Sequence, residues 1–325
     1  MRLVLERFVH NAGALLAVTT ILFFMFRLMP GTPLAAYIND NLNADQQRLM
    51  LEMFGLDKPM WMQYFIYLGN LLHGELGLSF FQRRPVLDIL LEVLPNSLIL
   101  TLASLIIAYI FGVLAGAWLA WRRGSWIERV AVPIVLASRA APEFWIGMVL
   151  LALLSFNLGW FPSGGANSPG MFYTSEWHRL VSLDYLQHLA LPVLTLALYL
   201  QGLPLLLMRS NMLEVMHEEF VVMARMKGFS QWRIVIRHAA RNALLPVVTA
   251  FALGIGISMG GNVVVETVFS WPGIGRMLVT AVANLDYPLA QGAFLMIALV
   301  LITMNFVADL LYMVLDPRVS HGRKG

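Results

Sequence analysis

Two charged residues in an otherwise apolar stretch are the first candidates for chemistry in this sequence. Arg139 and Glu143 lie four residues apart, with Pro142 between them. A charged side chain inside hydrocarbon costs roughly 2.5–3.5 kcal/mol on insertion scales, which makes such residues functional candidates. Two interpretations stay open. Either the pair neutralises its own charge beside a proline distortion, or it lies on a translocation path where the charged groups of a solute meet it.

Two more polar residues, Asn262 and Glu266, belong to a later apolar stretch. An asparagine in lipid by default hydrogen-bonds a neighbouring helix, which is worth about 0.6–2 kcal/mol. Glu266 either gates a passage or pairs with Arg276 at the membrane surface. Both residues are therefore candidates for a pathway or gate, with helix packing as the alternative.

Signals for catalysis are absent from the sequence. It contains no G-x-x-x-x-G-K-[ST] phosphate loop, which excludes ATP hydrolysis in this chain. Its seven histidines show no H-E-x-x-H or comparable spacing, and the absence of cysteine excludes disulfides and thiolate metal sites. We expect no catalytic residue, metal site or cofactor in this chain, and no nucleic-acid partner.

The composition indicates which kind of secondary structure holds the polar candidate residues in place. Hydrophobic residues make up 59% of the 325 residues, charged residues only 13%, and the mean hydropathy is +0.71. A soluble chain of this length needs far more polar surface. The apolar runs are about 20 residues or longer, enough to cross a hydrocarbon core of about 30 Å. We therefore predict an all-α polytopic membrane protein with six transmembrane helices, at 9–29, 98–121, 130–158, 189–208, 243–265 and 289–315.

The basic residues predict the orientation of these spans. Most lysines and arginines fall in 1–8, 122–129, 209–242 and 316–325, whereas the other three connections hold few. Basic loops stay in the cytoplasm, so both termini are expected there. The first span is too long for the apolar core of a secretory signal, so we interpret it as an uncleaved anchor.

The long polar connection after the first span is expected to form an ordered external layer. Residues 45–54 are a candidate short helix with Asn43 as its cap. From Trp61 to Leu72, aromatic and apolar residues recur at helical spacing, which predicts a helix along the outer membrane face. On this basis the chain divides into 1–97, the first span with its external loop, and 98–325, a five-helix core.

Small residues predict where helices approach closely. Gly112 and Gly116 form a small-xxx-small pair in the second span, whose start we place near Pro95 in a first helical turn. The fifth span is richer still in glycine and serine, from Gly254 to Gly261. Such a span indicates either tight packing or a backbone that flexes beside a passage.

A basic, helix-prone stretch precedes the fifth span, within the connection at 209–242. Glu218 and Glu219 near its start and Lys227 near the end of its first helical stretch complement a helix dipole. Gly228 has the position of a C-cap, because glycine adopts positive φ without penalty. We interpret the stretch as a docking element for a soluble partner. The alternative is an interfacial helix held by anionic lipid.

Short motifs, in order and over nearly the full length, carry a resemblance to a known family. They are Pro30–Pro33, Gly55–Pro59, Gly69–Gly77, Arg84–Val86, Leu94–Ser97, Ala224–Ser230, Arg237–Ala239, Arg241–Pro246, Glu266–Gly275, Asp286–Pro288 and Leu315–Arg318. The chain resembles the first of the two membrane subunits of ABC importers for oligopeptides, dipeptides and nickel. The resemblance implies the type I ABC importer permease fold in a bacterial inner membrane, with Glu266 near the outer mouth of the pathway.

The same resemblance implies a coupling role for the cytoplasmic stretch. In such importers this loop, called the EAA loop, docks in a groove of an ATPase subunit. Ala224 and Gly228 match its alanine and glycine positions, whereas Val222 stands where the acidic residue is expected. The implied coupling residues are Glu218, Glu219, Phe220, Ala224, Arg225, Lys227, Gly228 and Phe229.

The implied partners are a homologous second permease subunit, two ATPase subunits that hold ATP and Mg²⁺, and an external substrate-binding protein. Peptides are the expected cargo, with nickel chelates, opines or oligosaccharides as alternatives. Two other classes of protein are alternatives to an ABC importer permease. An ion-driven transporter needs ionisable groups at the midplane of discontinuous helices, and only Arg139 and Glu143 point that way. An intramembrane enzyme needs a catalytic constellation, and none is visible.

Overall fold

The computed structural model describes residues 2–28, 57–258 and 262–315. Its helices are α1 (Arg2–Arg27), α3 (Met60–Leu72), α4 (Val86–Trp121), α5 (Trp126–Ala140), α6 (Glu143–Leu150), η1 (Leu151–Asn157), α7 (Glu176–Leu180), α8 (Leu183–Leu200), α9 (Gly202–Val215), α10 (Glu219–Met226), α11 (Gln231–Arg233), η2 (Ile234–Ala240), α12 (Arg241–Ser258), α13 (Val263–Val268), α14 (Ile274–Ala283) and α15 (Tyr287–Leu315). No extended strand occurs among the described residues. The predicted all-α class is confirmed.

Membrane-spanning helices account for most of the described chain. Five are long and apolar enough to cross a bilayer: Val9–Arg27, Val86–Trp121, Leu183–Leu200, Gln231–Ile255 and Tyr287–Leu310. A sixth candidate is the pair α5 and α6 with η1, which is bent by 106°. The six predicted spans thus correspond to five straight candidates and one broken one, all within the described ranges.

The second span starts earlier than predicted, because α4 begins at Val86 and carries Pro95 in its interior rather than in its first turn. The added residues Val86, Leu90 and Val93 lie on one face and are buried. Burial of that face extends the helix past the proline, which removes only one backbone hydrogen bond.

The fourth and fifth spans also differ from the prediction. The fourth is interrupted at Gln201, where α8 ends and α9 begins. The fifth helix starts at Gln231, so residues 231–242, predicted as part of a helix-prone connection, are continuous with the fifth span and include the wide π-type turns of η2. These turns accommodate basic residues such as Arg237 on an exposed face while Ile234 and Val235 are buried. The connecting loop proper is therefore shorter than the predicted 209–242.

Two compact units divide the chain. The first comprises residues up to 95 and 273–302, and the second comprises 96–272 and residues from 303. The predicted division at residue 97 concerns membrane topology and stays a prediction. The expected helix at 45–54 with its Asn43 cap, the motif Pro30–Pro33, Gly260, Gly261 and the C-terminal ten residues lie outside the described residues.

In the first unit, the external helix predicted from Trp61 to Leu72 is confirmed as α3. Its Tyr64 hydroxyl hydrogen-bonds Thr20 of α1 at 2.7 Å, and its ring lies 5.3 Å from that of Phe23. Tyr67 also contacts Phe23, and burial raises the pKa of Tyr67 to about 12. Aromatic packing and a hydrogen bond thus fix α3 against α1.

The side chain of Asp286 holds the loop before α4 in the same unit. Ser79 Oγ donates to its Oδ2, and the backbone amides of Phe80 and Phe81 donate at 3.1 Å each. The amide of Leu289, in the first turn of α15, donates at 3.3 Å to Oδ1, which also accepts from the amide of Phe80. One buried side chain therefore satisfies several backbone donors at once.

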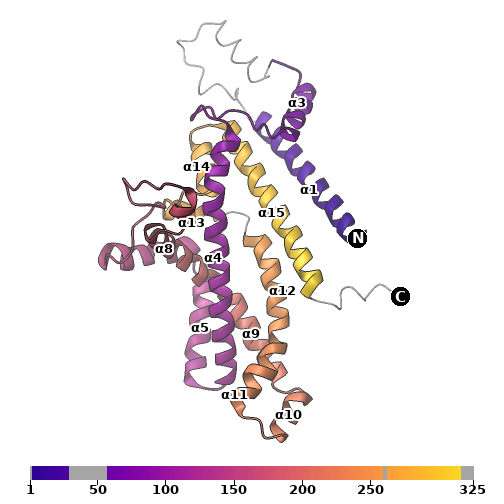
Figure 1. Cartoon of the computed structure of the whole chain (residues 1–325), viewed down its shortest axis with the longest axis vertical. Helices are drawn as coiled ribbons and strands as arrows, with labels where there is room; N and C mark the ends of the chain where they lie inside the picture. Colours follow the sequence, from indigo (N-terminus) through magenta and orange to yellow (C-terminus); the bar gives the residue numbers. More distant parts are fainter. Residues whose placement is uncertain (1, 29–56, 259–261, 316–325) are drawn as a thin grey trace. The chain divides into compact units, whose positions relative to one another are not determined.

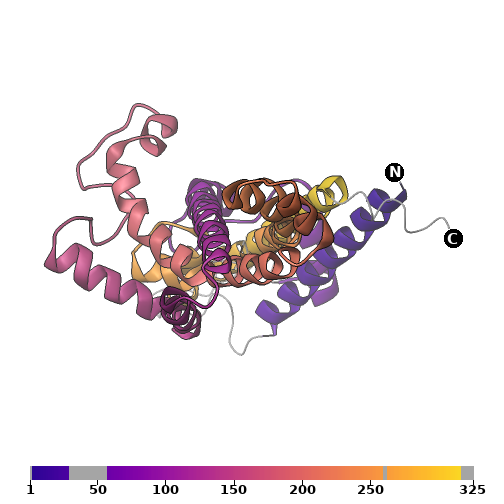
Figure 2. The same ribbon diagram turned by 90° about the horizontal axis from the view of Figure 1, so that it is seen from below.

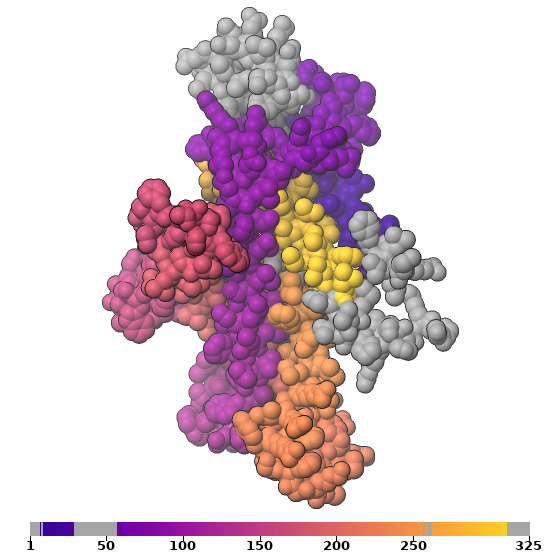
Figure 3. Space-filling view, in the orientation of Figure 1, coloured from indigo at the N-terminus to yellow at the C-terminus, as the bar shows by residue number. Residues whose placement is uncertain are grey.

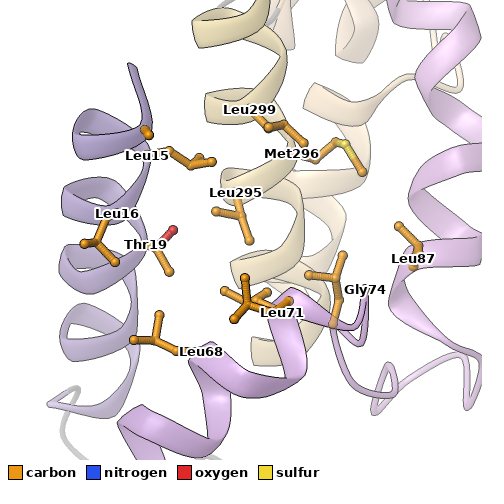
Figure 4. A pocket seen from close by; sticks show the side chains of 13 residues that line it. Leu15, Leu16, Thr19, Leu68, Leu71, Gly74, Leu87, Leu295, Met296 and Leu299 are labelled. Carbon is orange, nitrogen blue, oxygen red and sulfur yellow. The ribbon is translucent and has the colours of Figure 1, made fainter. Parts of the chain in front are cut away.

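An apolar cavity of about 520 Å³ lies in the first unit between α1, α3, the start of α4 and α15. Leu15 and Thr19 of α1 point toward Leu295 of α15 across it, and Leu68 and Leu71 of α3 lie at one end (Figure 4). Because α1 and α15 are candidate spans, this lining matches hydrocarbon.

Close helix contacts hold the second unit together. A Cβ built on Gly116 of α4 would lie 2.4 Å from the carbonyl oxygen of Leu205 in α9, and one on Gly112 would lie 2.8 Å from Pro204 Cγ. The predicted close approach at this glycine pair is confirmed. The segment from α6 to α8 projects to one side of the second unit (Figures 1 and 2).

A buried ion pair joins α5 to α9. Glu128 accepts from Arg209 Nε at 2.9 Å and from the backbone amide of Gly124 at 2.6 Å. Ser125 caps α5 by accepting from the amide of Glu128. Because Glu128 is buried, the pair fixes the turn 122–125 against α9.

Candidate functional site

The predicted docking element forms a short helix, α10, at one end of the second unit (Figures 1 and 3). Val221 and Ala224 point inward and pack with Ile234, whereas Phe220 and Phe229 are partly buried at the edge of this cluster. Apolar residues at positions three apart thus bury one face of α10 against the following helix.

Glu218 is the N-cap residue and Glu219 lies in the first turn of α10. Their carboxylates are exposed and complement the positive end of the helix dipole. Arg225 in the last turn and Lys227 at the C-cap complement the negative end in the same way. The charge pattern noted in the sequence therefore coincides with the observed helix ends.

The C-terminus of α10 has a complete Schellman motif. Gly228 adopts φ +75°, its amide bonds to the Arg225 carbonyl at 2.9 Å, and the Phe229 amide bonds to the Ala224 carbonyl at 3.3 Å. The predicted glycine cap is confirmed. It ends the helix and turns the chain toward α11.

The outward face of α10 is an apolar ridge, which we define as Val222, Met223 and Met226. Met226 is 82% exposed, and the other two side chains are also exposed. Helical spacing places all three on the side opposite Val221 and Ala224. Val222 and Met223 occupy the place of the missing acidic residue, so this face presents hydrocarbon and thioether groups instead of a carboxylate. The role of Met226 was not anticipated, although its i, i+4 relation to Val222 is visible in the sequence.

Aromatic contacts tie the docking element to the membrane helices. The Phe229 ring stacks on His238 of η2 with centroids 5.6 Å apart, and the Arg233 guanidinium lies 4.8 Å from the Phe229 ring centroid. Trp232 of α11 contacts Trp121 at the end of α4, with centroids 5.7 Å apart. These contacts connect the segment that follows α10 to α4 and to the helix from Gln231 to Ile255. Trp121 and Trp232 were not among the predicted site residues, because no sequence pattern pairs residues so far apart.

Arg139 and Glu143, predicted as an i, i+4 pair of one helix, lie on different helices. Arg139 is in the last turn of α5 and Glu143 is in the first turn of α6, on either side of the 106° bend. Ala141 and Pro142 adopt extended backbone, so the distortion expected at Pro142 is a full break of the helix. A place for the two residues on a translocation path stays a prediction. Each charge complements the dipole of its own helix end.

Asn262 and Glu266 both bond to α4. Ser97 Oγ donates to Glu266 Oε1 at 2.6 Å, and Asn262 Nδ2 donates to Thr101 Oγ1 at 2.6 Å. Glu266 is fully buried. These bonds fasten α13 along one turn of α4 in the arrangement described.

Asn96 is a hub beside this pair that sequence reasoning missed. Its amide donates to the Pro272 carbonyl at 2.9 Å, and its Oδ1 accepts from Arg179 and Tyr185 at 3.2 Å each. The Trp271 indole donates to its backbone carbonyl at 3.2 Å. Residues of the motifs at 94–97 and 266–275 are therefore in contact. In the sequence, the two motifs are related only because both belong to the set that carries the family resemblance. The part of the chain that the structure describes holds no cluster of three metal-ligating side chains.

The described residues form a helical chain with several candidate membrane spans and a short capped helix, α10, at one end of the second unit. Comparison with known families identifies the class of membrane protein. Residues 110–321 match the family of binding-protein-dependent transport system inner membrane components. Residues 1–101 match the N-terminal domain of such membrane components. The chain belongs to this family of permease subunits, and it is a multi-pass membrane protein of a transport system with other subunits.

Individual relatives cover nearly the whole chain. The di/tripeptide transport system permease protein DppB of Pseudomonas aeruginosa is 39% identical over 94% of this chain and 95% of its own length. The oligopeptide transport system permease protein AppB of Bacillus subtilis is 34% identical, with 98% and 99% covered. The glutathione transport system permease protein GsiC of Escherichia coli K12 is 34% identical, with 98% of each covered.

Proposed function

We propose that this chain is a permease subunit of an ATP-driven importer of peptides in the bacterial inner membrane. The substrate class follows from the relatives, whose names specify di- and tripeptides, oligopeptides and glutathione. Import of nickel chelates, opines or oligosaccharides is the alternative within the same family. In this proposal a homologous second permease subunit completes the pathway, and an external binding protein delivers the cargo.

The coupling role depends on one observation, the exposed apolar ridge of α10. An apolar helix face that extends from a basic loop is the form in which a helix docks into a partner's groove. In our proposal two ATPase subunits supply that groove, and they carry the ATP and Mg²⁺ that this chain does not bind. Arg225 and Lys227 flank the ridge, so a groove with an acidic rim would complement it.

Coupling follows from the differential contacts of α10 in two ATPase states. A partner shifts the permease between inward-facing and outward-facing forms only if it binds them with different affinity. The contacts of Trp232 with Trp121 and of Phe229 with His238 convert movement of α10 into movement of α4 and of the helix from Gln231 to Ile255. Arg139, Glu143, Asn262 and Glu266 are the proposed pathway or gate residues.

Charge on the ridge tests the docking role. Met226→Glu places a carboxylate on a surface side chain, so folding is unaffected while docking into an apolar groove is opposed. We expect co-purification of the ATPase subunits from detergent to fall about tenfold, as for loss of a central apolar contact. Gln231→Glu, an exposed change in neighbouring α11, is the matched control. Unchanged ATPase recovery with Met226→Glu would refute docking through this ridge.

A further inference from the structure

The break between α5 and α6 has the features of a contact site for the transported solute. This inference depends on the proposed import function. α5 and the helical segment from α6 through η1 are long and apolar enough for a span only together, and the pair, bent by 106°, is either one broken span or a re-entrant loop. In both cases the break lies inside an apolar segment. Since α5 has 15 residues, the break lies about 22 Å along the helix from its start, short of the roughly 30 Å of hydrocarbon.

Both charges at the break are accessible and lack partners. Arg139 is exposed and Glu143 half-buried, and neither makes a hydrogen bond or ion pair within the described ranges. Irregular backbone and charge at membrane depth are tolerated only where protein buries them or where they line a water-filled cavity. The described residues leave Arg139 exposed and Glu143 half-buried, which is the exposure that residues lining a water-filled passage would have.

A second helix interruption lies at the same place. A Cβ built on Gly202 would lie 3.3 Å from Arg139 Cδ and 3.4 Å from its Cβ, so the arginine stem packs on the start of α9, next to Gln201, where α8 ends. The boundary between α8 and α9 therefore lies beside the break between α5 and α6, and the break is a discontinuous helix of the kind that transporters use at binding sites.

We propose that this break is a contact site for a zwitterionic solute, at which Arg139 binds a carboxylate and Glu143 binds an ammonium group. The guanidinium and the uncapped N-terminal amides of α6 favour an anion. The Glu143 carboxylate and the terminal carbonyl groups of α5 favour a cation. A free peptide carries both groups, whereas one blocked at either end lacks one of them.

Protection of an engineered cysteine tests this site in the assembled importer without its binding protein. The chain has no native cysteine, so Ala140→Cys, at an exposed position beside the break, gives one reactive thiol on this subunit. Millimolar free dipeptide is expected to slow maleimide labelling of this chain's band at least threefold. The C-terminally amidated and N-acetylated forms of the same dipeptide should slow it less than 1.5-fold.

Charge-neutral variants complete the test. Arg139→Gln or Glu143→Gln in the Ala140→Cys background should abolish protection, whereas Arg129→Gln, the same change at the other end of α5, should preserve it. Equal protection in all backgrounds, or none in Ala140→Cys alone, overturns the proposal. ATP-dependent dipeptide uptake, measured in parallel with the binding protein, separates the two claims. Uptake without protection refutes only the contact site, and absence of uptake refutes the proposed function.

Discussion

At the scale of single residues, Gly228 determines where α10, the proposed coupling helix, ends. Gly228 holds φ +75°, a conformation that costs other L-residues roughly 1–2 kcal/mol, although asparagine adopts it more readily. No heavy atom outside its neighbours lies within 4 Å of a Cβ built there. Any loss of stability or uptake when Gly228 is substituted therefore comes from backbone strain and not from steric crowding of the new side chain.

We expect Gly228→Val to reduce ATP-coupled uptake at least tenfold, because a β-branched residue at this φ opens the Schellman turn and misdirects α10. Gly228→Asn should keep at least a third of wild-type uptake. Gly124→Val, at φ +82° in another turn of the second unit with open space around it, controls for strain alone. Uptake by Gly228→Val equal to that of Gly124→Val would contradict a special role for this cap. Uptake and membrane abundance are measured together.

At the scale of elements, the crossing of α4 and α9 is the tightest feature of the second unit. The backbone of α9 lies where a side chain on Gly116 would be, so glycine is required by contact and not by conformation. The glycine pair in the second span predicted this close crossing, because small residues permit helices to approach closely in a membrane.

Gly116→Ala should therefore lower the thermal stability of the purified importer, by ~1–3 kcal/mol for an overpacked contact. Gly13→Ala in α1, where nothing lies within 4 Å, should leave stability unchanged or raise it by up to about 1 kcal/mol, because alanine has the higher helix propensity. Thermal unfolding followed by circular dichroism in detergent compares the two. Equal effects of both substitutions would show that α4 and α9 separate without cost.

At the scale of the whole molecule, the basic residues predict that the loop with α10 faces the cytoplasm, and that the connection before α7 faces outward. The absence of cysteine makes this directly measurable. Met226→Cys and Phe172→Cys each place one thiol at an exposed position.

In intact spheroplasts, a membrane-impermeant maleimide should label Phe172→Cys and not Met226→Cys. After the membrane is permeabilised, both should react. The wild-type chain, which has no thiol, supplies the blank. Labelling of Met226→Cys before permeabilisation would reverse the topology and remove the proposed ATPase contact.

The sequence by itself determined the helical class, the approximate place of the apolar spans, the capped helix α10 and the glycine contact of α4. All of these follow from local rules: apolar run length, helical period, dipole-matched charges and residues that permit special backbone geometry. Such signals lie within a few residues of the feature they predict.

Only the tertiary structure decided that Arg139 and Glu143 lie on different helices, that Asn96 gathers Pro272, Arg179 and Tyr185, and that Trp232 contacts Trp121. It also extended α4 past Pro95 and moved the start of the fifth helix to Gln231. The reason is that these outcomes depend on burial and hydrogen bonding between segments distant in the chain, which override local propensity.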